Sequence, residues 1–442
     1  MPVISSPIER REFGVRFDQA ITNLKSKLPE ASGGWDSLAG PVHAKVFTVA
    51  GATSADLARD IQKGLVDALS QGTTITQFRK DFDAAVQKHG WTYNGKRGWR
   101  TEVIFNANMR SARMAGKWQQ LQDNAEDQPY LQYRTAGDAR VRPQHRAWNG
   151  LVYPLVDAFW HTHYPPNGWN CRCTVRAYGA ADLASKGLSL SKPYPQQYRD
   201  VVNRDGQLTD RVPLGIDPGW DHNVGTSWIT PEMALGRKLA ALPRELQGLV
   251  VDKTISPAYQ TALAGRWRDF RAAIKAGTQA ADSAQVLGFL DSATLDGLAA
   301  HVPALGVQST AVLAFADQSA RLGAGISAGT GAGVGASAWP GQWVDDLPIE
   351  LRNYRAVIWD SIEQRLLVLP MGKLPGAGGG LGALPAAVLK PNAASEFGPA
   401  FALESLGAVD AAQLRQPGRF KVLSGGIARH TESAGQGGQN QP

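Results

Sequence analysis

Cysteine is nearly absent from the 442 residues of this chain: only Cys171 and Cys173 occur, with a single residue between them. Two such thiols cannot build a disulfide framework, and a bond across so short a loop would be strained. We therefore expect either two free thiols or two soft ligands of a metal ion.

Long apolar runs are also missing. The first residues, MPVISSPIERREF, lack the apolar core of a secretory signal. No stretch reaches the roughly 18–20 apolar residues that a membrane helix needs. We expect a chain without membrane contact that stays in a reducing aqueous compartment until it is assembled into something.

Common catalytic signatures are absent as well. The sequence contains no Gly-x-Ser-x-Gly, His-Glu-x-x-His or Walker A motif. ATPase chemistry is therefore not expected, and we predict that the chain is not an enzyme.

The composition is that of a globular protein, with 43% hydrophobic and 19% charged residues. The length is too great for one ordinary core, which predicts two or three domains. Lysine and arginine exceed aspartate and glutamate by 46 to 39, a net charge of +7. This mild excess permits contact with nucleic acid or an acidic protein surface but does not require it.

The apolar pattern predicts an α+β fold in four parts. Leucine, isoleucine, phenylalanine and valine recur at helical spacing in 54–69, 76–86 and 100–122. The predicted order is a helical N-terminal part, a small turn-rich β module at about 130–177, a helical middle and a small β-containing C-terminal unit. The predicted divisions are an N-terminal arm (1–39), a main domain (40–230), a helical region (231–321), a Gly-rich linker (322–338), a small α+β domain (339–423) and a disordered tail (424–442).

The residues with the most chemical information lie between Asp138 and Cys173. Imidazole and thiolate are the ligands that Zn²⁺ prefers in closed tetrahedral sites, and a segment with few aliphatic residues gains most from a metal crosslink. We predict His145, Cys171 and Cys173 as ligands of at most one Zn²⁺, with Asp138, His163 or water as the fourth.

The spacing leaves an alternative open. In an extended strand, the two side chains of Cys-x-Cys point to the same face but start about 7 Å apart, so both bind one ion only if the sulfurs converge. Otherwise Asp138, His145 and the cysteines satisfy backbone groups in a hydrogen-bonded turn and fill a small core.

These residues also carry a resemblance. The motif reads Asp138-x-Arg140-x-Arg142-Pro-x-His145-x-x-x-x-Gly150, then Phe159-Trp160, then Pro165-Pro166-Asn-Gly168-Trp169-Asn-Cys171-Arg172-Cys173. It resembles the signature of the phage Mu F-like head morphogenesis family, over roughly residues 40–230.

The resemblance implies a minor capsid protein of the virion, made in the host cytoplasm and located in the capsid interior near the portal. It would act in head assembly and in DNA packaging or ejection. Its implied partners are the portal protein and the major capsid or scaffold protein, with non-specific contact to packaged DNA. The residues expected to stabilise the module or bind a partner are Arg140, Arg142, Gly150, Trp169 and Arg172.

Two other functions remain open. The first is a Mu F-type effector whose C-terminal unit is an RNase-like enzyme, for which Glu350, Glu363, Arg365 and Lys373 are the available groups; the single histidine after residue 338 is His430. The second is a zinc-dependent nucleic-acid binder, which the scattered rather than clustered basic residues disfavour.

Overall fold

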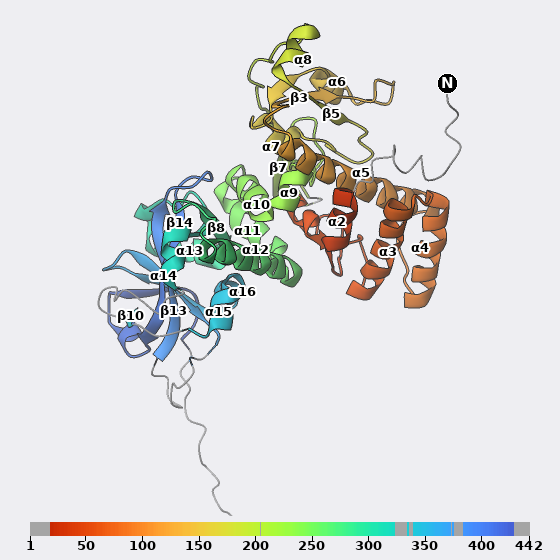
Figure 1. The fold of residues 1–442 in the computed structure, drawn as a ribbon. Helices are drawn as coiled ribbons and strands as arrows, with labels where there is room; N and C mark the ends of the chain where they lie inside the picture. Colours follow the sequence, from red (N-terminus) through yellow and green to blue (C-terminus); the bar gives the residue numbers. More distant parts are fainter. Residues whose placement is uncertain are drawn as a thin grey trace, which may run out of the picture.

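A computed structural model describes residues 18–203, 205–322, 334–335, 339–372, 374 and 383–427. The chain is α+β, as predicted, with its longer helices in the first two thirds and its largest sheet formed mainly by the last third (Figure 1). Most of the predicted Gly-rich linker and of the predicted tail lies outside the described residues. No helix among the described residues has the length and apolarity needed to cross a membrane.

The N-terminal part is helical around its own core of Leu57, Ile61, Phe78 and Phe82. Its elements are α2 (Asp18–Ser26), β1 (Leu28–Pro29), η1 (Gly40–Ala44), β2 (Val46–Phe47), α3 (Ala55–Gln71), α4 (Ile75–His89) and α5 (Arg97–Asp123). Helix α2 packs against α5, and β1 pairs with β2 in parallel.

Local signals place the helix boundaries. The Ser54 side chain accepts a hydrogen bond from the backbone N–H of Leu57 at 3.2 Å and so caps the start of α3. Gly72 and Gly90 end α3 and α4 in the left-handed conformation, with φ of 71° and 58°. These starts and stops were predictable because each depends on one residue type at one position.

The turn-rich module, residues 130–178, contains a three-stranded antiparallel sheet in the order β4-β3-β5. Its elements are β3 (Tyr130–Arg134), α6 (Pro143–Trp148), β4 (Val152–Pro154), α7 (Phe159–His163) and β5 (Thr174–Tyr178). The three strands lie within one residue of the predicted bounds of the module, about 130–177. The module, drawn in yellow and orange in Figure 1, lies beside the long helix α5.

After the module, the chain leads through α8 (Ala180–Ser185) to a hairpin that the sequence pattern did not predict. Its strands are β6 (Tyr198–Val202) and β7 (Leu208–Pro213). Strand β6 is almost wholly exposed, so it lacks the apolar alternation that marks a strand in a sequence. Four helices follow: α9 (Val224–Ile229), α10 (Pro231–Ala240), α11 (Arg244–Thr254) and α12 (Pro257–Lys275).

The C-terminal part is a sheet ordered β15-β11-β12-β13-β14-β9-β8, with β10 paired to β14. Its strands are β8 (Ala284–Phe289), β9 (Ala311–Phe315), β10 (Val334–Gly335), β11 (Tyr354–Asp360), β12 (Arg365–Pro370), β13 (Ala383–Ala393), β14 (Ala400–Asp410) and β15 (Phe420–Gly425). The short helical elements around it are α13 (Ser292–His301), η2 (Pro303–Leu305), α14 (Ala316–Leu322), α15 (Gly341–Asp345), α16 (Leu347–Arg352) and η3 (Gln413–Arg415).

The predicted helical middle therefore holds two strands besides its helices. Strands β8 and β9 form a hairpin, and β9 pairs in parallel with β14. The first four residues of β9 are all buried, so the run Ala-Val-Leu-Ala-Phe shows no alternation. A short, fully apolar run of this kind cannot be assigned to a strand or a helix by its pattern alone.

Candidate functional site

The two motif stretches of the turn-rich module fold against each other. The Asp138 carboxylate accepts two hydrogen bonds from the Arg172 guanidinium, at 2.7 and 2.6 Å, and a third from the backbone N–H of Arg140 at 3.1 Å. The hydrogen bond from Arg172 is the main cause that lowers the pKa of Asp138 to about 2. A forked ion pair thus joins residues that are 34 positions apart.

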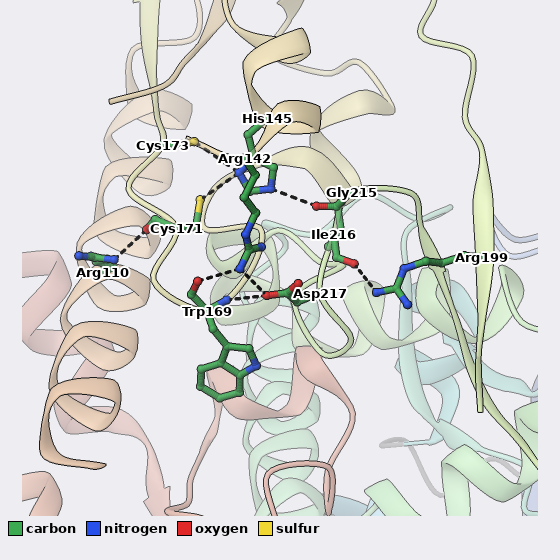
Figure 2. Close-up of polar contacts among 10 residues, drawn as sticks. All are labelled: Arg110, Arg142, His145, Trp169, Cys171, Cys173, Arg199, Gly215, Ile216 and Asp217. Atoms are coloured by element: carbon green, nitrogen blue, oxygen red, sulfur yellow. Dashed lines mark hydrogen bonds and ion pairs between the residues drawn. The ribbon is translucent and has the colours of Figure 1, made fainter. Parts of the chain in front are cut away.

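Beside this ion pair, one imidazole faces two thiols. Nδ1 of His145 lies 3.7 Å from Sγ of Cys171 and 3.6 Å from Sγ of Cys173. The three ligand atoms lie within 4.8 Å of one another, and all three residues are buried. Figure 2 shows the two sulfurs on the same side of the imidazole ring. The predicted His145, Cys171 and Cys173 cluster is therefore present in the fold.

The tautomer of His145 is set by a backbone group. Nε2 lies 3.0 Å from the carbonyl oxygen of Gly215. A carbonyl only accepts hydrogen bonds, so Nε2 carries the proton and the lone pair of Nδ1 points at the thiols. Histidine ligands of metal ions usually donate their other N–H to such an acceptor. The ring of His145 is therefore oriented as in a metal-binding histidine, with Nε2–H on a carbonyl oxygen and Nδ1 facing the thiols.

The sulfurs converge because the cysteines do not lie in a strand. Strand β5 begins at Thr174, and Asn170 adopts a left-handed conformation with φ of 59° just before Cys171. The backbone here is a turn, so the wide separation of Cys-x-Cys in an extended strand does not apply. Hydrogen bonding from Cys173 lowers the pKa of Cys171 well below that of a free thiol. The neighbouring Cys171 raises the pKa of Cys173.

Asp138 and His163, the alternatives for a fourth ligand, lie outside this cluster. Both oxygens of Asp138 are bound to Arg172. His163 is completely buried, with its ring centroid 4.4 Å from that of Phe159 and 4.7 Å from that of Trp148. Burial lowers the pKa of His163 to about 3, so the ring is neutral at pH 7. Among the residues that the structure describes, only His145, Cys171 and Cys173 form such a group.

A second ion pair ties the module to the chain that follows it. Arg142 donates to the Asp217 carboxylate at 2.9 Å and to the carbonyl oxygen of Trp169 at 3.0 Å (Figure 2). Asp217 also accepts from the backbone N–H of Trp169 at 2.9 Å. The neighbouring Gly168 leaves no room for a side chain, because an added Cβ would lie 2.2 Å from Nη1 of Arg142 and 2.4 Å from Asp217.

The remaining motif residues differ in their surroundings. Gly150 adopts φ of 93°, and its N–H donates to the carbonyl oxygen of Tyr133 at 2.9 Å, which closes the turn into β4. Trp169 is 37% exposed and packs edge-on against Trp220. Arg140 is mostly exposed, 3.6 Å from Asp138.

The residues that sequence reasoning missed are Gly215 and Asp217, which position His145 and Arg142. Both lie in a short loop after β7, about 70 residues beyond their partners. A lone aspartate in a turn carries no signal of a distant arginine, because only the folded chain brings them together.

A cavity of about 350 Å³ opens beside the three ligand atoms. One glutamate, Glu102, and four arginines line it together with His145 and the two cysteines; the arginines are Arg110, Arg140, Arg142 and Arg172. Arg110 also donates to the carbonyl oxygen of Cys171 at 3.2 Å. The cluster is therefore reachable from a pocket of positive charge.

Among the described residues, two of the groups considered for a C-terminal enzyme, Arg365 and Glu363, lie in different surroundings. Arg365 is 3% exposed and lies 3.7 Å from Asp360 and 3.9 Å from Glu404, inside the sheet domain. Glu363 is exposed in the turn between β11 and β12. Lys373 and His430 lie outside the described residues. Arg365 thus belongs to a buried ion pair, and Glu363 belongs to a turn exposed to solvent.

Comparison with protein families gives the class of this region. Residues 59–176 match the family model described as Phage Mu protein F like protein. The match runs from α3 to β5 and includes the Asp138–Arg172 pair and the His145, Cys171 and Cys173 cluster. The chain therefore carries a Mu F-like region, and the resemblance inferred from the motif is confirmed.

Two relatives can be named. The chain is 32% identical over 251 residues to the Escherichia phage Mu protein named "Putative capsid assembly protein F", covering 50% of this chain and 57% of that protein. It is 30% identical over 232 residues to the Mu-like prophage FluMu F protein of Haemophilus influenzae, covering 46% of this chain and 56% of that protein. The match thus spans little more than half the length of each relative. No solved structure matches the chain.

Proposed function

We propose that this chain is a head morphogenesis protein of a phage or prophage, built into the virion as a minor capsid component. One observation carries the proposal: the residues that define the resemblance are brought together by the fold, within a region that matches the Mu F-like family. The name of the phage Mu relative, which refers to capsid assembly, supports the same function. The role is structural, so the chain acts through interaction surfaces and not through a catalytic pocket.

The proposed place is the capsid interior near the portal, with the portal protein and the major capsid or scaffold protein as partners. The net charge of +7 supports weak, non-specific contact with packaged DNA. A role in packaging or ejection follows from that position.

We also propose that the turn-rich module binds one Zn²⁺ through His145, Cys171 and Cys173. The donor set fits, because one neutral nitrogen and two sulfurs are the ligands that Zn²⁺ prefers. When bound, the ion would crosslink the two motif stretches and hold Cys171 and Cys173 as thiolates. The fourth ligand is then a water molecule in the adjoining cavity, since Asp138 and His163 are engaged elsewhere.

The test of the assembly function is a phage or prophage in which this gene carries an early stop codon. We expect few mature heads by electron microscopy, with recovery when the intact gene is supplied in trans. Mass spectrometry of purified tail-less heads should find the protein at a few copies per particle. Normal yields of infectious particles without the protein would contradict the proposal.

A further inference from the structure

A second and larger cavity, of about 700 Å³, lies between α2, β2, α5 and the loop at 218–224. Its size falls within the range of roughly 300–1,000 Å³ that is typical of binding sites. Most of its wall is apolar, with contributions from Val46, Phe47, Val103, Ile104, Ala107 and Val224. The metal cluster does not contribute to it.

The charged groups of this cavity have one sign. Lys27 and Arg100 line it, and no Asp or Glu is found among the described residues of its wall. The Arg100 guanidinium is engaged with the carbonyl oxygens of Ala50 and Asn94. Lys27 is only 7% exposed and makes no ion pair with any described residue. A buried ammonium without an anion is costly, so Lys27 is a strong recognition group for a carboxylate.

Further polar atoms are left without partners in the same wall. Oδ1 of Asn23, which is 2% exposed, and Nδ1 of His222, which is 7% exposed, have no hydrogen-bond partner among the described residues. Burial, followed by the charge of Lys45, also lowers the pKa of Lys27 to about 8. These groups would gain hydrogen bonds from a polar ligand, which indicates a binding site and not a packing void.

Three large aromatic side chains around the cavity are exposed. Trp35 is 50% exposed, Trp99 61% and Trp169 37%, and all three line the cavity. Tryptophan is enriched at the energetically dominant positions of protein–protein interfaces. Exposed tryptophans around an apolar, positively charged cavity favour a protein segment over a small metabolite as its occupant.

We propose that this cavity binds a short peptide segment of an assembly partner, with a large apolar side chain in the cavity and a carboxylate on Lys27. The identification of the partner as an assembly partner rests on the proposed function, whereas the peptide chemistry does not. Residues 1–17 of the chain itself carry three arginines and two glutamates, so they match the positive cavity less well than an acidic partner would.

Two fluorescent probes of similar shape test the cavity in the full-length protein. Anilinonaphthalene sulfonate carries an anion, and N-phenyl-1-naphthylamine is its neutral counterpart. We expect Lys27→Met to weaken the anionic probe about 10-fold, because a charge-assisted contact is lost, and to leave the neutral probe within about two-fold. Ser111→Phe, which fills the cavity from α5, should weaken both. Lys25→Met, on the exposed face of α2, is the matched control and should change neither.

Displacement by peptides then tests the kind of occupant. The capped peptide acetyl-ALWELA-amide should displace the anionic probe, and acetyl-ALWQLA-amide should do so about 10-fold less well. The preference for the acidic peptide should disappear in Lys27→Met. Circular dichroism of each variant shows whether it is folded.

Three results would overturn the proposal. They are an unchanged affinity of the anionic probe in Lys27→Met, no probe binding to the wild-type protein, and probe binding that neither peptide displaces. None of them concerns head assembly, so this proposal and the assembly function can fail separately.

Discussion

At the level of single residues, the site depends on how His145 is held. Its Nε2–H is bound to Gly215, and its Nδ1 faces Cys171 and Cys173. The sequence allowed the prediction that these three residues meet, because soft ligands are rare in this chain. The sequence could not indicate Gly215, because every residue has a backbone carbonyl and only the fold decides which one His145 contacts.

Zinc content is the first prediction at this scale. We expect about one equivalent of Zn²⁺ in the purified wild-type chain and less than about a tenth in Cys171→Ser or Cys173→Ser, because each variant loses a thiolate ligand. His163→Phe is the control and should keep its zinc, since the structure places His163 in an aromatic cluster. Elemental analysis gives the result, and zinc-free wild-type protein would refute the metal site.

Lys27 gives a prediction about pH. Its pKa falls from 10.5 to about 8 in the folded protein. Between these values the unfolded chain binds more protons, so the free energy of unfolding should rise with pH from about 8 to about 10.5. Below pH 8 both states are protonated and this contribution is flat. Lys27→Met should abolish the rise and stabilise the protein at pH 7 by something on the order of 3 kcal/mol.

Urea unfolding of both proteins at several pH values measures this difference. Lys25→Met serves as the control, because that lysine is exposed on α2, two residues before Lys27. Parallel pH profiles for the wild-type and Lys27→Met proteins would show that the amine is not buried as described.

At the level of elements, the helices and strands that depend on nearby residues could be predicted from the sequence, and those that depend on distant pairing could not. The start of α3 at Ser54 and the strands of the turn-rich module follow from local chemistry, and the sequence predicted them. Strand β9 depends on distant pairing with β14, about 90 residues further along the chain. Its fully apolar run, Ala-Val-Leu-Ala-Phe, fits a buried helix equally well, so tertiary context decided the outcome.

The turn within the second motif stretch gives a prediction at this scale. Gly168→Ala should destabilise the module by about 1–3 kcal/mol, because the new Cβ would collide with Arg142 and Asp217. Gly98→Ala, where an added Cβ meets nothing, is the matched control and should be neutral or slightly stabilising. Thermal melting and limited proteolysis of residues 130–178 measure both. Equal melting of the two variants would argue against close packing at Gly168.

At the level of the whole molecule, the net charge of +7 favours contact with negatively charged partners such as DNA. We expect weak DNA binding without sequence preference. A plot of the logarithm of the binding constant against the logarithm of the salt concentration should have a slope of about −0.9 for each phosphate contact. Fluorescence anisotropy with two unrelated duplexes measures it. Binding to one sequence that persists at raised salt would instead favour a specific nucleic-acid reader over a head protein.

The central claim is that the folded motif region places this chain in a viral head. Its most direct test is the number of copies of the protein per purified head, measured by quantitative mass spectrometry, for wild-type and Cys171→Ser/Cys173→Ser chains supplied to a phage that lacks the gene. We expect a few copies of the wild-type chain per head and near absence of the variant, with a matching fall in infectious particles. Equal incorporation and equal infectivity of the two chains would contradict it.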